Sequence, residues 1–402
     1  MAAQELNFQS VIEWLDAGAP PAQGPQEVLK LLCNRLVDQG LPLHRVAVFV
    51  RTLHPNVAGR GFIWHGQQNI VEIVTAEIGI RDTEQYQKSP VRVVFEENVE
   101  VRKRIEGRDG PLEFPILDDL RKESATDFFA VPIRFINGEV HGASFVTRQR
   151  GGFSDAQIEA IRRVMPAFSR VAEIYAWRRT ARNILDAYLG EQTGEKVLAG
   201  KIRRGDGEDI RAVIWFCDLR DSTPIADSMS RAEFLGLLNE FFECILGPVL
   251  EHKGEVLRFI GDAALAIFPI PGEGELAERA EASRRAVLAA STAIERMAAF
   301  NAKRERKLRF GIGLHLGHVL YGNIGTPTRI EFTVIGAAAN EAARIEGFCK
   351  TLDVPLVISE PVARHVPDRV SLGSHRLRGV EEPVELFTLT AIRPSPARKI
   401  SA

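Results

Sequence analysis

The chain lacks several features that would fix its class at once. Its four cysteines stand far apart, without a Cys-x-x-Cys pair, which argues against a disulfide framework and against a thiolate zinc site. No apolar run approaches the ~20 residues that cross a bilayer. Residues 1–8 lack the basic and apolar stretches of a signal peptide. We therefore expect a cytoplasmic protein with no membrane span.

A strong net charge is also missing. The 51 Lys and Arg residues nearly cancel the 53 Asp and Glu residues, so no global field favours nucleic acid or an anionic membrane as a partner. The hydrophobic content of 45% with 7% aromatic residues is typical of globular domains. At about 100–200 residues per domain, the 402 residues predict two or three domains.

The sequence pattern of the N-terminal part predicts an α+β module. A helix is predicted at 28–37, with strands at 46–51 and 128–135. Asn137-Gly138 stands between two apolar segments and predicts a hairpin with a tight primed turn, which needs φ > 0 at both residues. Ser154 is placed to cap the helix that follows.

This order of an apolar hairpin, a glycine break and Phe153-Ser154-Asp155 opening a helix resembles the end of a GAF domain. About the last 45 residues of the module carry the resemblance. It implies a GAF-like regulatory or sensory domain over residues 1–154. The effector that such a domain would bind is unknown from the sequence.

Residues 155–192 have a helical pattern. One apolar seam at spacings of three and four residues is formed by Ile158, Ile161, Met165, Phe168, Ala172 and Tyr175. The pattern breaks at Arg178, Arg179 and Arg182 before it resumes. Two interpretations stay open: a helix packed on its own domain, or a parallel dimeric coiled coil. With the glycine-rich joint that follows, the segment 155–204 is predicted as a helical linker.

Two acidic residues stand at the ends of apolar strands. Asp218 ends the strand 212–218, and the turn-rich stretch 219–224 leads from it into a helix, where free N–H groups could hold phosphate oxygens. Asp262 lies at the tip of a hairpin whose turn is Gly261-Asp262. If strand and hairpin are neighbours, the two carboxylates repel each other unless they share hard cations such as Mg²⁺.

Two further segments complete the C-terminal pattern. Residues 309–325 predict two short strands around a glycine turn. A helix is predicted to begin near Ala337, and on it Asn340 and Arg344 are four residues apart and share a face. An amide and a guanidinium on one face could bind a ribose and a polyphosphate.

Together these elements resemble the class III adenylyl and guanylyl cyclase catalytic domain across residues 205–390. The motifs that carry the resemblance are Phe216-Cys217-Asp218, Ile260-Gly261-Asp262, Gly311-Ile-Gly-Leu-His-Leu-Gly317, Gly322-Asn-Ile-Gly325, Thr333-Val-Ile-Gly336 and Asn340-x-Ala-Ala-Arg344. The resemblance implies an α+β domain of the ferredoxin-like βαββαβ type over 205–392, preceded by the dimerising helix and the α+β GAF-like domain. Residues 393–402 are expected to form a flexible tail.

The resemblance also implies a role for each site residue. Asp218 and Asp262 would hold two Mg²⁺ or Mn²⁺ ions per site, Asn340 would orient the ribose, and Arg344 would bind the phosphate in the transition state. Arg378, in Leu377-Arg378-Gly379, takes the position that binds the triphosphate. Other substrate contacts are implied for Leu219, Ser222 and Thr223 beside the phosphates, and for Arg258 and Thr333 at the base.

The implied reaction is conversion of ATP to 3′,5′-cyclic AMP and pyrophosphate. Arg258 stands where adenylyl cyclases commonly have Lys and guanylyl cyclases Glu, so Thr333 with Arg258 favours ATP without excluding GTP. Asp221-Ser222 and Ala337-Ala338-Ala339 also depart from the common residues, Gly-Phe and Asp-Thr-Val. A diguanylate cyclase would need a Gly-Gly-Asp/Glu-Glu-Phe turn, which 260–264 lacks.

In this family the metal carboxylates come from one subunit and the other groups from its partner. The resemblance therefore implies a homodimer with two equivalent sites at its interface. Two alternatives to an adenylate cyclase stay open: a guanylate cyclase, and a catalytically silent cyclase-like module that only dimerises and signals.

Overall fold

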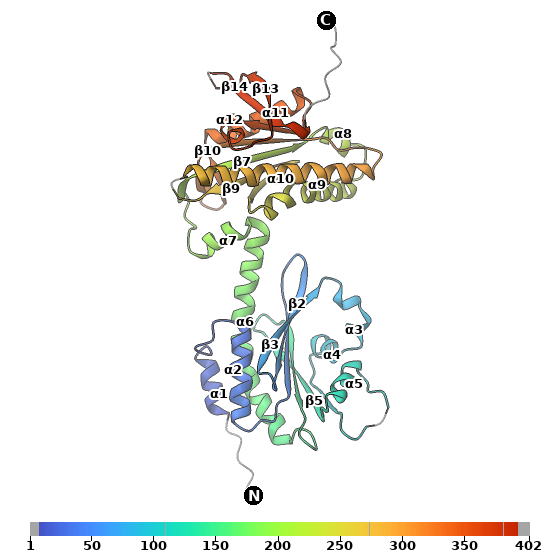
Figure 1. Cartoon of the computed structure of the whole chain (residues 1–402). Coiled ribbons are helices and arrows are strands. Elements are labelled where there is room, and N and C mark those ends of the chain that lie inside the picture. The colour runs from blue at the N-terminus through green and yellow to red at the C-terminus, as the bar shows by residue number, and fades with distance from the viewer. Residues whose placement is uncertain (1–7, 109, 273, 381, 393–402) are drawn as a thin grey trace. The chain divides into compact units, whose positions relative to one another are not determined.

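The computed structural model describes residues 8–108, 110–272, 274–380 and 382–392. The tail predicted at 393–402 lies outside the described residues. The chain divides into two compact units, residues 1–187 and 188–402 (Figure 1), and each is described by itself. Of the helices in the described part of the chain, none combines the length and the hydropathy that spanning a bilayer requires.

The N-terminal unit is built on a six-stranded antiparallel sheet in the order β3-β2-β1-β6-β5-β4. Its strands are β1 (Arg45–Arg51), β2 (Val57–His65), β3 (Ile70–Glu77), β4 (Val101–Arg104), β5 (Asp127–Arg134) and β6 (Val140–Thr147). One face packs on α1 (Gln9–Asp16), α2 (Pro25–Asp38) and α6 (Asp155–Leu189). Across the other face run α3 (Glu84–Gln87), α4 (Pro90–Glu97) and α5 (Pro115–Lys122) (Figure 1). The predicted helix and strands of this unit are confirmed.

The β5–β6 hairpin forms where it was predicted, but its turn is different. Gly138 has φ +85°, whereas Asn137 does not have a positive φ. The Phe135 N–H donates to the Glu139 carbonyl at 3.0 Å, so the loop holds three residues instead of two. The Asn137 side chain accepts from the Glu139 N–H at 2.9 Å, which ties Asn137 into the turn without a left-handed backbone.

The long helix α6 begins at the predicted cap, because Ser154 Oγ accepts from the Gln157 N–H at 3.3 Å. The predicted seam is buried within its own unit, where Ile158, Ile161, Met165 and Phe168 join the core formed with α1, α2 and the sheet. Packing on its own unit is therefore the correct interpretation for this seam. Further along, a different set of apolar side chains is exposed, namely Ile174, Trp177, Ile184 and Tyr188.

The C-terminal unit contains α7 (Glu191–Leu198) near its start and has an eight-stranded sheet. The order is β13-β14-β12-β10-β7-β9-β8, with β11 paired to β10. The strands are β7 (Gly207–Leu219), β8 (Glu255–Ile260), β9 (Ala263–Ile270), β10 (Phe310–Gly325), β11 (Ile330–Ile335), β12 (Leu356–Ser359), β13 (Arg369–His375) and β14 (Val384–Leu389). The order β7-α9-β8-β9-α10-β10 along the chain is the predicted β-α-β-β-α-β succession.

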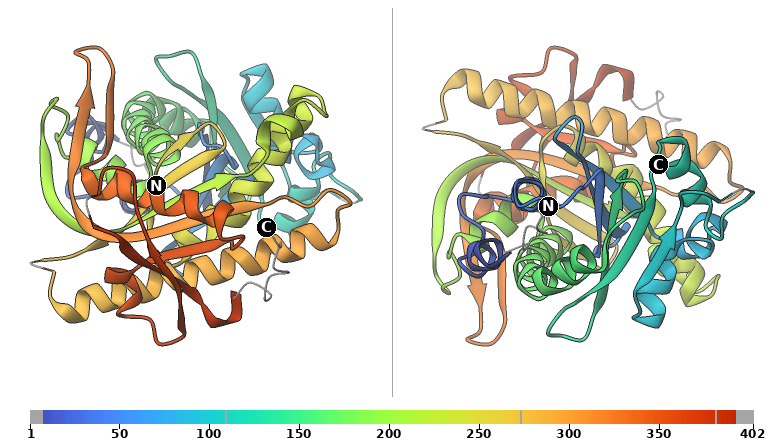
Figure 2. Two further views of the ribbon diagram at one scale, coloured as in Figure 1. Left: turned by 90° about the horizontal axis from the view of Figure 1, so that it is seen from above. Right: turned by 90° about the horizontal axis from the view of Figure 1, so that it is seen from below.

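Helices cover both faces of this sheet (Figure 2). On one face, α9 (Arg231–Glu251), α10 (Leu276–Ala302) and α12 (Glu360–Ala363) share a core with Trp215, Phe268 and Ile312 of the sheet. On the other, Ala338 and Ala342 of α11 (Ala337–Thr351) pack on the central strands. The short helix α8 (Ser222–Ala226) follows β7.

The prediction for residues 309–325 was wrong. Residues 310–325 form one strand, β10, of 16 residues, not two short strands around a glycine turn. The glycines of this strand serve close packing. A Cβ atom at Gly313 would stand 2.6 Å from the Ala342 carbonyl oxygen and 2.6 Å from the Glu346 amide nitrogen, both in α11. Because these glycines have no side chains, α11 can pack directly on β10.

Gly313→Ala tests this packing. Backbone atoms cannot yield as a flexible side chain can, so the substitution should push α11 off the sheet and lower the free energy of unfolding by about 1–3 kcal/mol. Amide hydrogen exchange should rise in 337–351. Gly236→Ala is the matched control, because Gly236 lies in α9 with nothing within 4 Å of an added Cβ atom. Equal protection of α11 in both variants would contradict this account.

Candidate active site

Strand pairing places the two predicted metal carboxylates beside each other. Asp218 is the last but one residue of β7, and its Cα partner on β9 is Ala263, directly after Asp262. The Leu219 N–H donates to the Asp262 carbonyl at 3.3 Å. Gly261 has φ +66°, the conformation that the tight β8–β9 turn requires at this position. Both carboxylates are half-buried.

The pKa of Asp218 reflects this arrangement. Partial burial raises it above its ordinary value, and the negative charge of Asp262 raises it further. Within the described residues, no three acidic, His or Cys side chains gather to form a complete metal cluster. Carboxylate oxygens are the donors that hard cations such as Mg²⁺ prefer, with oxygens from a substrate or water completing the coordination. Bringing such a cation to this pair would relieve the repulsion between the carboxylates.

The segment after β7 holds the other predicted phosphate contacts. The Leu219 side chain is buried in the core. Asp221 stands before α8 with φ +58°, and Ser222 and Thr223 open that helix, half-buried and exposed respectively. The Arg220 N–H donates to the Arg309 carbonyl at 2.8 Å, which ties the turn to the chain that enters β10.

A second group of predicted residues lies at α11 and the turn before β14. Asn340 and Arg344 are both exposed on α11. A Cβ atom added at Gly379 would stand 3.4 Å from a terminal nitrogen of Arg344, so Arg344 lies beside the turn that contains Arg378, which is also exposed. Among the described residues, no hydrogen bond or ion pair joins this group to Asp218 or Asp262.

The predicted base-selecting residues lie on β8 and β11. Arg258 forms an ion pair with Glu331, with 3.0 Å between Nε and Oε1. Thr333 is two residues further along β11 and is 3% exposed. Its hydroxyl is buried without a hydrogen-bond partner in the described part of the chain. The sequence did not predict the contact of Glu331 with Arg258, because the two residues are far apart in the chain.

Sequence reasoning also missed Glu346, which lies on α11 two residues after Arg344. Its side chain packs over Gly311, the Cα partner of Asp218 across β10 and β7. Burial raises the pKa of Glu346 to about 7, the charge of Asp218 adds to the rise, and Arg220 opposes it. A third carboxyl group, that of Glu346, therefore lies close to the strand that carries Asp218. The sequence pattern of the helix does not distinguish Glu346 from an ordinary helix residue.

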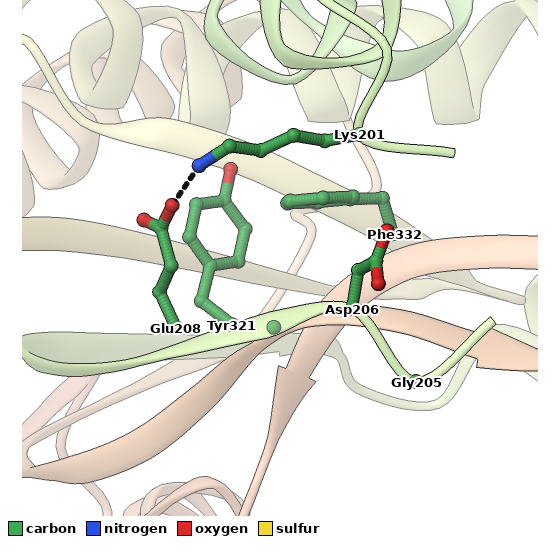
Figure 3. A pocket seen from close by; sticks show the side chains of 7 residues that line it. Lys201, Gly205, Asp206, Glu208, Tyr321 and Phe332 are labelled. Atoms are coloured by element: carbon green, nitrogen blue, oxygen red, sulfur yellow. Dashed lines mark hydrogen bonds and ion pairs between the residues drawn. The ribbon is translucent and has the colours of Figure 1, made fainter. Parts of the chain in front are cut away.

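A pocket of about 430 Å³ lies elsewhere in this unit (Figure 3). Figure 3 shows the side chains of Tyr321 and Phe332 lining it, together with the Lys201–Glu208 ion pair. None of the predicted site residues lines it. Next to it, the Tyr321 hydroxyl donates to Glu255 at 2.7 Å and lies 2.9 Å from the Thr193 hydroxyl. These buried hydrogen bonds fasten α7 to the start of β8.

Comparison with known families decides the class of the C-terminal unit. Residues 208–379 match the adenylate and guanylate cyclase catalytic domain. Each residue of the predicted site lies inside this match.

Two similar curated proteins come from Mycobacterium tuberculosis. The uncharacterized protein Rv1320c is 33% identical over 237 residues, which cover 58% of this chain and 40% of that protein. The uncharacterized protein Rv1319c is 33% identical over 219 residues, covering 53% and 39%. The chain thus spans about 40% of the length of these relatives.

Similar solved structures include cyclases of both substrate types. A bacterial light-regulated adenylyl cyclase is 25% identical with a TM-score of 0.41, over 46% of this chain and 93% of that chain. The guanylyl cyclase Cya2 is 24% identical with a TM-score of 0.39, over 48% and 97%.

The buried carboxyl group of Glu346 gives a pH-dependent prediction. A folded-state pKa of about 7 against the ordinary 4.5 means that the unfolded chain ionises first as pH rises. Stability is then lost between about pH 4.5 and 7, by on the order of 3 kcal/mol. With a chelator present, Glu346→Gln should be about as stable as the wild type at pH 4.5 and more stable at pH 8. Denaturant unfolding at both pH values measures this, and a difference that does not change with pH would contradict it.

Proposed function

We propose that this protein is a nucleotidyl cyclase that converts ATP to 3′,5′-cyclic AMP and pyrophosphate. The observation that carries the proposal is the pairing of β7 with β9, which sets Asp218 beside Asp262 inside a region that matches the cyclase family. The reaction is an in-line attack of the substrate 3′-hydroxyl on the α-phosphorus. A guanylate cyclase is the alternative, because the matched family contains both activities.

Asp218 and Asp262 would hold the divalent cations, Mg²⁺ or Mn²⁺, in a proposed stoichiometry of two per site. Bound there, the cations supply positive charge that favours deprotonation of the 3′-hydroxyl and neutralises the leaving pyrophosphate. The role of the protein in this step would be to hold the two carboxylates beside each other at the ends of adjacent strands. The raised pKa of Asp218 supports this, since metal-free carboxylates so placed disfavour full ionisation.

The remaining groups would act on the phosphates and the ribose. Arg344 would stabilise the charge that grows on the α-phosphate in the transition state, where such a group lowers a barrier. Asn340, one turn earlier on α11, would hold the ribose. Arg378 would bind the terminal phosphates, and the closeness of the neighbouring residue Gly379 to the Arg344 guanidinium supports a site where both arginines contact the same triphosphate. The segment of Leu219, Ser222 and Thr223 would contact the phosphates next to the cations.

Substrate choice would rest on Arg258 and Thr333. Arg258 donates hydrogen bonds, as Lys does at this position in adenylyl cyclases, and the buried hydroxyl of Thr333 has no hydrogen-bond partner among the residues that the structure describes. Both features favour a purine base as the group that these two side chains would bind. We propose ATP over GTP on the cationic group at Arg258, where guanylyl cyclases commonly have Glu.

A homodimer would complete the site. Asn340, Arg344 and Arg378 are exposed and, among the described residues, form no hydrogen bond or ion pair with the aspartates, which supports a site shared between two copies. The exposed residues Ile174, Trp177, Ile184 and Tyr188 recur at spacings of three, seven and four along α6. That is the pattern of a coiled-coil seam, and it supports a parallel dimer through the second half of the helix.

Residues 1–154 would be the regulatory part. We propose a GAF-like sensory domain for an unidentified effector, which alters activity through α6 and α7. The attachment of α7 to β8 through Thr193, Tyr321 and Glu255 supports this route, because β8 leads to Arg258 and the Asp262 turn. A catalytically silent signalling module is the alternative if no condition gives product.

Product analysis tests the reaction. The full-length protein is incubated with ATP or GTP, with Mg²⁺ or Mn²⁺, and the cyclic nucleotide is identified by mass. Wild type should form cyclic AMP, and Asp262→Ala should reduce the rate at least 100-fold because one metal carboxylate is gone. Cyclic GMP as the main product would overturn the substrate proposal. No product from wild type in any mixture would overturn the proposed activity of this chain.

Subunit mixing tests the shared site. Asp262→Ala and Arg344→Ala should each be inactive alone, since each loses a group from both sites of its homodimer. After subunit exchange, the mixed dimer keeps one site with both groups intact, so activity should return to at most half of the wild-type value per mixed dimer. A mixture of Asp262→Ala with Asp218→Ala serves as control, because both lesions fall on the same half of the site. Return of activity in the control, or none in the first mixture, would contradict the shared site.

A further inference from the structure

A histidine of the central strand β10 contacts the helix that carries two of the proposed ligands. His315 Nε2 lies 3.2 Å from Glu341 Oε2 on α11, and His315 Nδ1 lies 3.0 Å from the Ser359 hydroxyl at the end of β12. The His315 side chain is 12% exposed and that of Glu341 is 28% exposed, whereas Ser359 is fully buried. The imidazole of His315 therefore connects β12 with α11.

The two partners determine where the hydrogen lies on this imidazole. Burial lowers the pKa of His315, and the negative charge of Glu341 opposes the fall, so the ring is neutral at neutral pH and has one N–H donor. A carboxylate accepts hydrogen bonds and does not donate them. His315 Nε2 therefore donates to Glu341, and Nδ1 accepts from the Ser359 hydroxyl. This pair of hydrogen bonds holds the Glu341 carboxylate towards β10.

Glu341 stands between the two proposed ligands on α11, directly after Asn340 and three residues before Arg344. Side chains three residues apart on a helix are neighbours, and opposite charges at this spacing attract each other. Arg344 is exposed and, among the residues that the structure describes, forms no hydrogen bond or ion pair. A Glu341 carboxylate released from His315 would therefore be within reach of the Arg344 guanidinium.

A pair between Glu341 and Arg344 would matter more for the reaction than for folding. An exposed pair at this spacing is weak, and alone it would lower the free fraction of the guanidinium only about twofold. The carboxylate would also repel the negative charge that grows on the α-phosphate, and charges a few ångströms apart near a protein surface interact more strongly than that. Together the two effects predict a loss of about fivefold in rate.

We propose that His315 is a positioning residue, which holds the Glu341 carboxylate away from Arg344 and so leaves the guanidinium free to bind phosphate. His315 contacts neither substrate nor cation and acts through Glu341. Ser359 contributes by fixing the orientation of the imidazole ring. This inference rests on the proposed function, and it adds a residue pair whose part is to keep a competing negative charge away from the phosphate ligand.

The test measures kcat and KM of the full-length protein for the nucleotide that the wild type prefers. In His315→Ala the released carboxylate should lower kcat about fivefold with little change in KM, because Arg344 acts on the transition state. In His315→Ala combined with Glu341→Gln the competing charge is gone, so kcat should return to within about twofold of wild type. A merely structural role for His315 predicts no such recovery, since losing a second contact cannot repair the packing.

Three single variants serve as controls. His315→Gln places an amide N–H donor near the position of Nε2 and should keep most of the activity. Glu341→Gln alone should stay within about twofold of wild type. His318→Ala removes an exposed histidine of the same strand, which contacts Arg211 at 2.6 Å, and it should also stay within about twofold.

The outcomes separate this inference from the proposed function. An active wild type with an unimpaired His315→Ala variant, or with a double variant as slow as His315→Ala, would overturn the inference and leave the proposed function standing. A Glu341→Gln variant as slow as His315→Ala would also overturn it, because the carboxylate would then be required. A wild type without product in any mixture of nucleotide and metal would overturn both.

Discussion

The candidate site depends on one backbone constraint, the antiparallel pairing of β7 with β9. That pairing sets Asp218 opposite Ala263 and so brings two like charges together, which costs free energy in the metal-free protein. Strand hydrogen bonds and a buried core around Trp215 and Phe268 hold the arrangement against the repulsion. A cation bound between the carboxylates, as proposed, would recover this cost.

A second constraint is the direct contact of α11 with β10. Gly313 and its neighbouring glycines remove side chains where the helix meets the strand, and the helix then carries Asn340 and Arg344 at its exposed side. Glu346 is the carboxyl group that this close contact buries, and burial raises its pKa to about 7. The same packing therefore positions the proposed phosphate ligand and creates a titratable group near the Asp218 strand.

Local signals in the sequence predicted most of the elements. Ser154 marked the start of α6, Gly261-Asp262 marked a hairpin, and Asn340 with Arg344 marked a helix face, because caps, turns and periodicity depend on nearby residues. The error at β10 has a tertiary cause, since glycines typical of a turn serve close helix packing there. The ion pair of Glu331 could not be predicted for a similar reason: its partner, Arg258, is 73 positions earlier in the chain. The roles of the ten predicted site residues remain predictions.

The central claim is that Asp218 and Asp262 together form a cation site, and Mn²⁺ binding tests it most directly. Electron paramagnetic resonance counts free Mn²⁺ during titration of the full-length protein with 3′-deoxy-ATP, which has no 3′-hydroxyl and cannot cyclise. The wild type should bind more Mn²⁺ than the nucleotide alone accounts for, and Asp218→Asn and Asp262→Asn should each lose that excess. Equal Mn²⁺ binding by all three proteins would contradict the account.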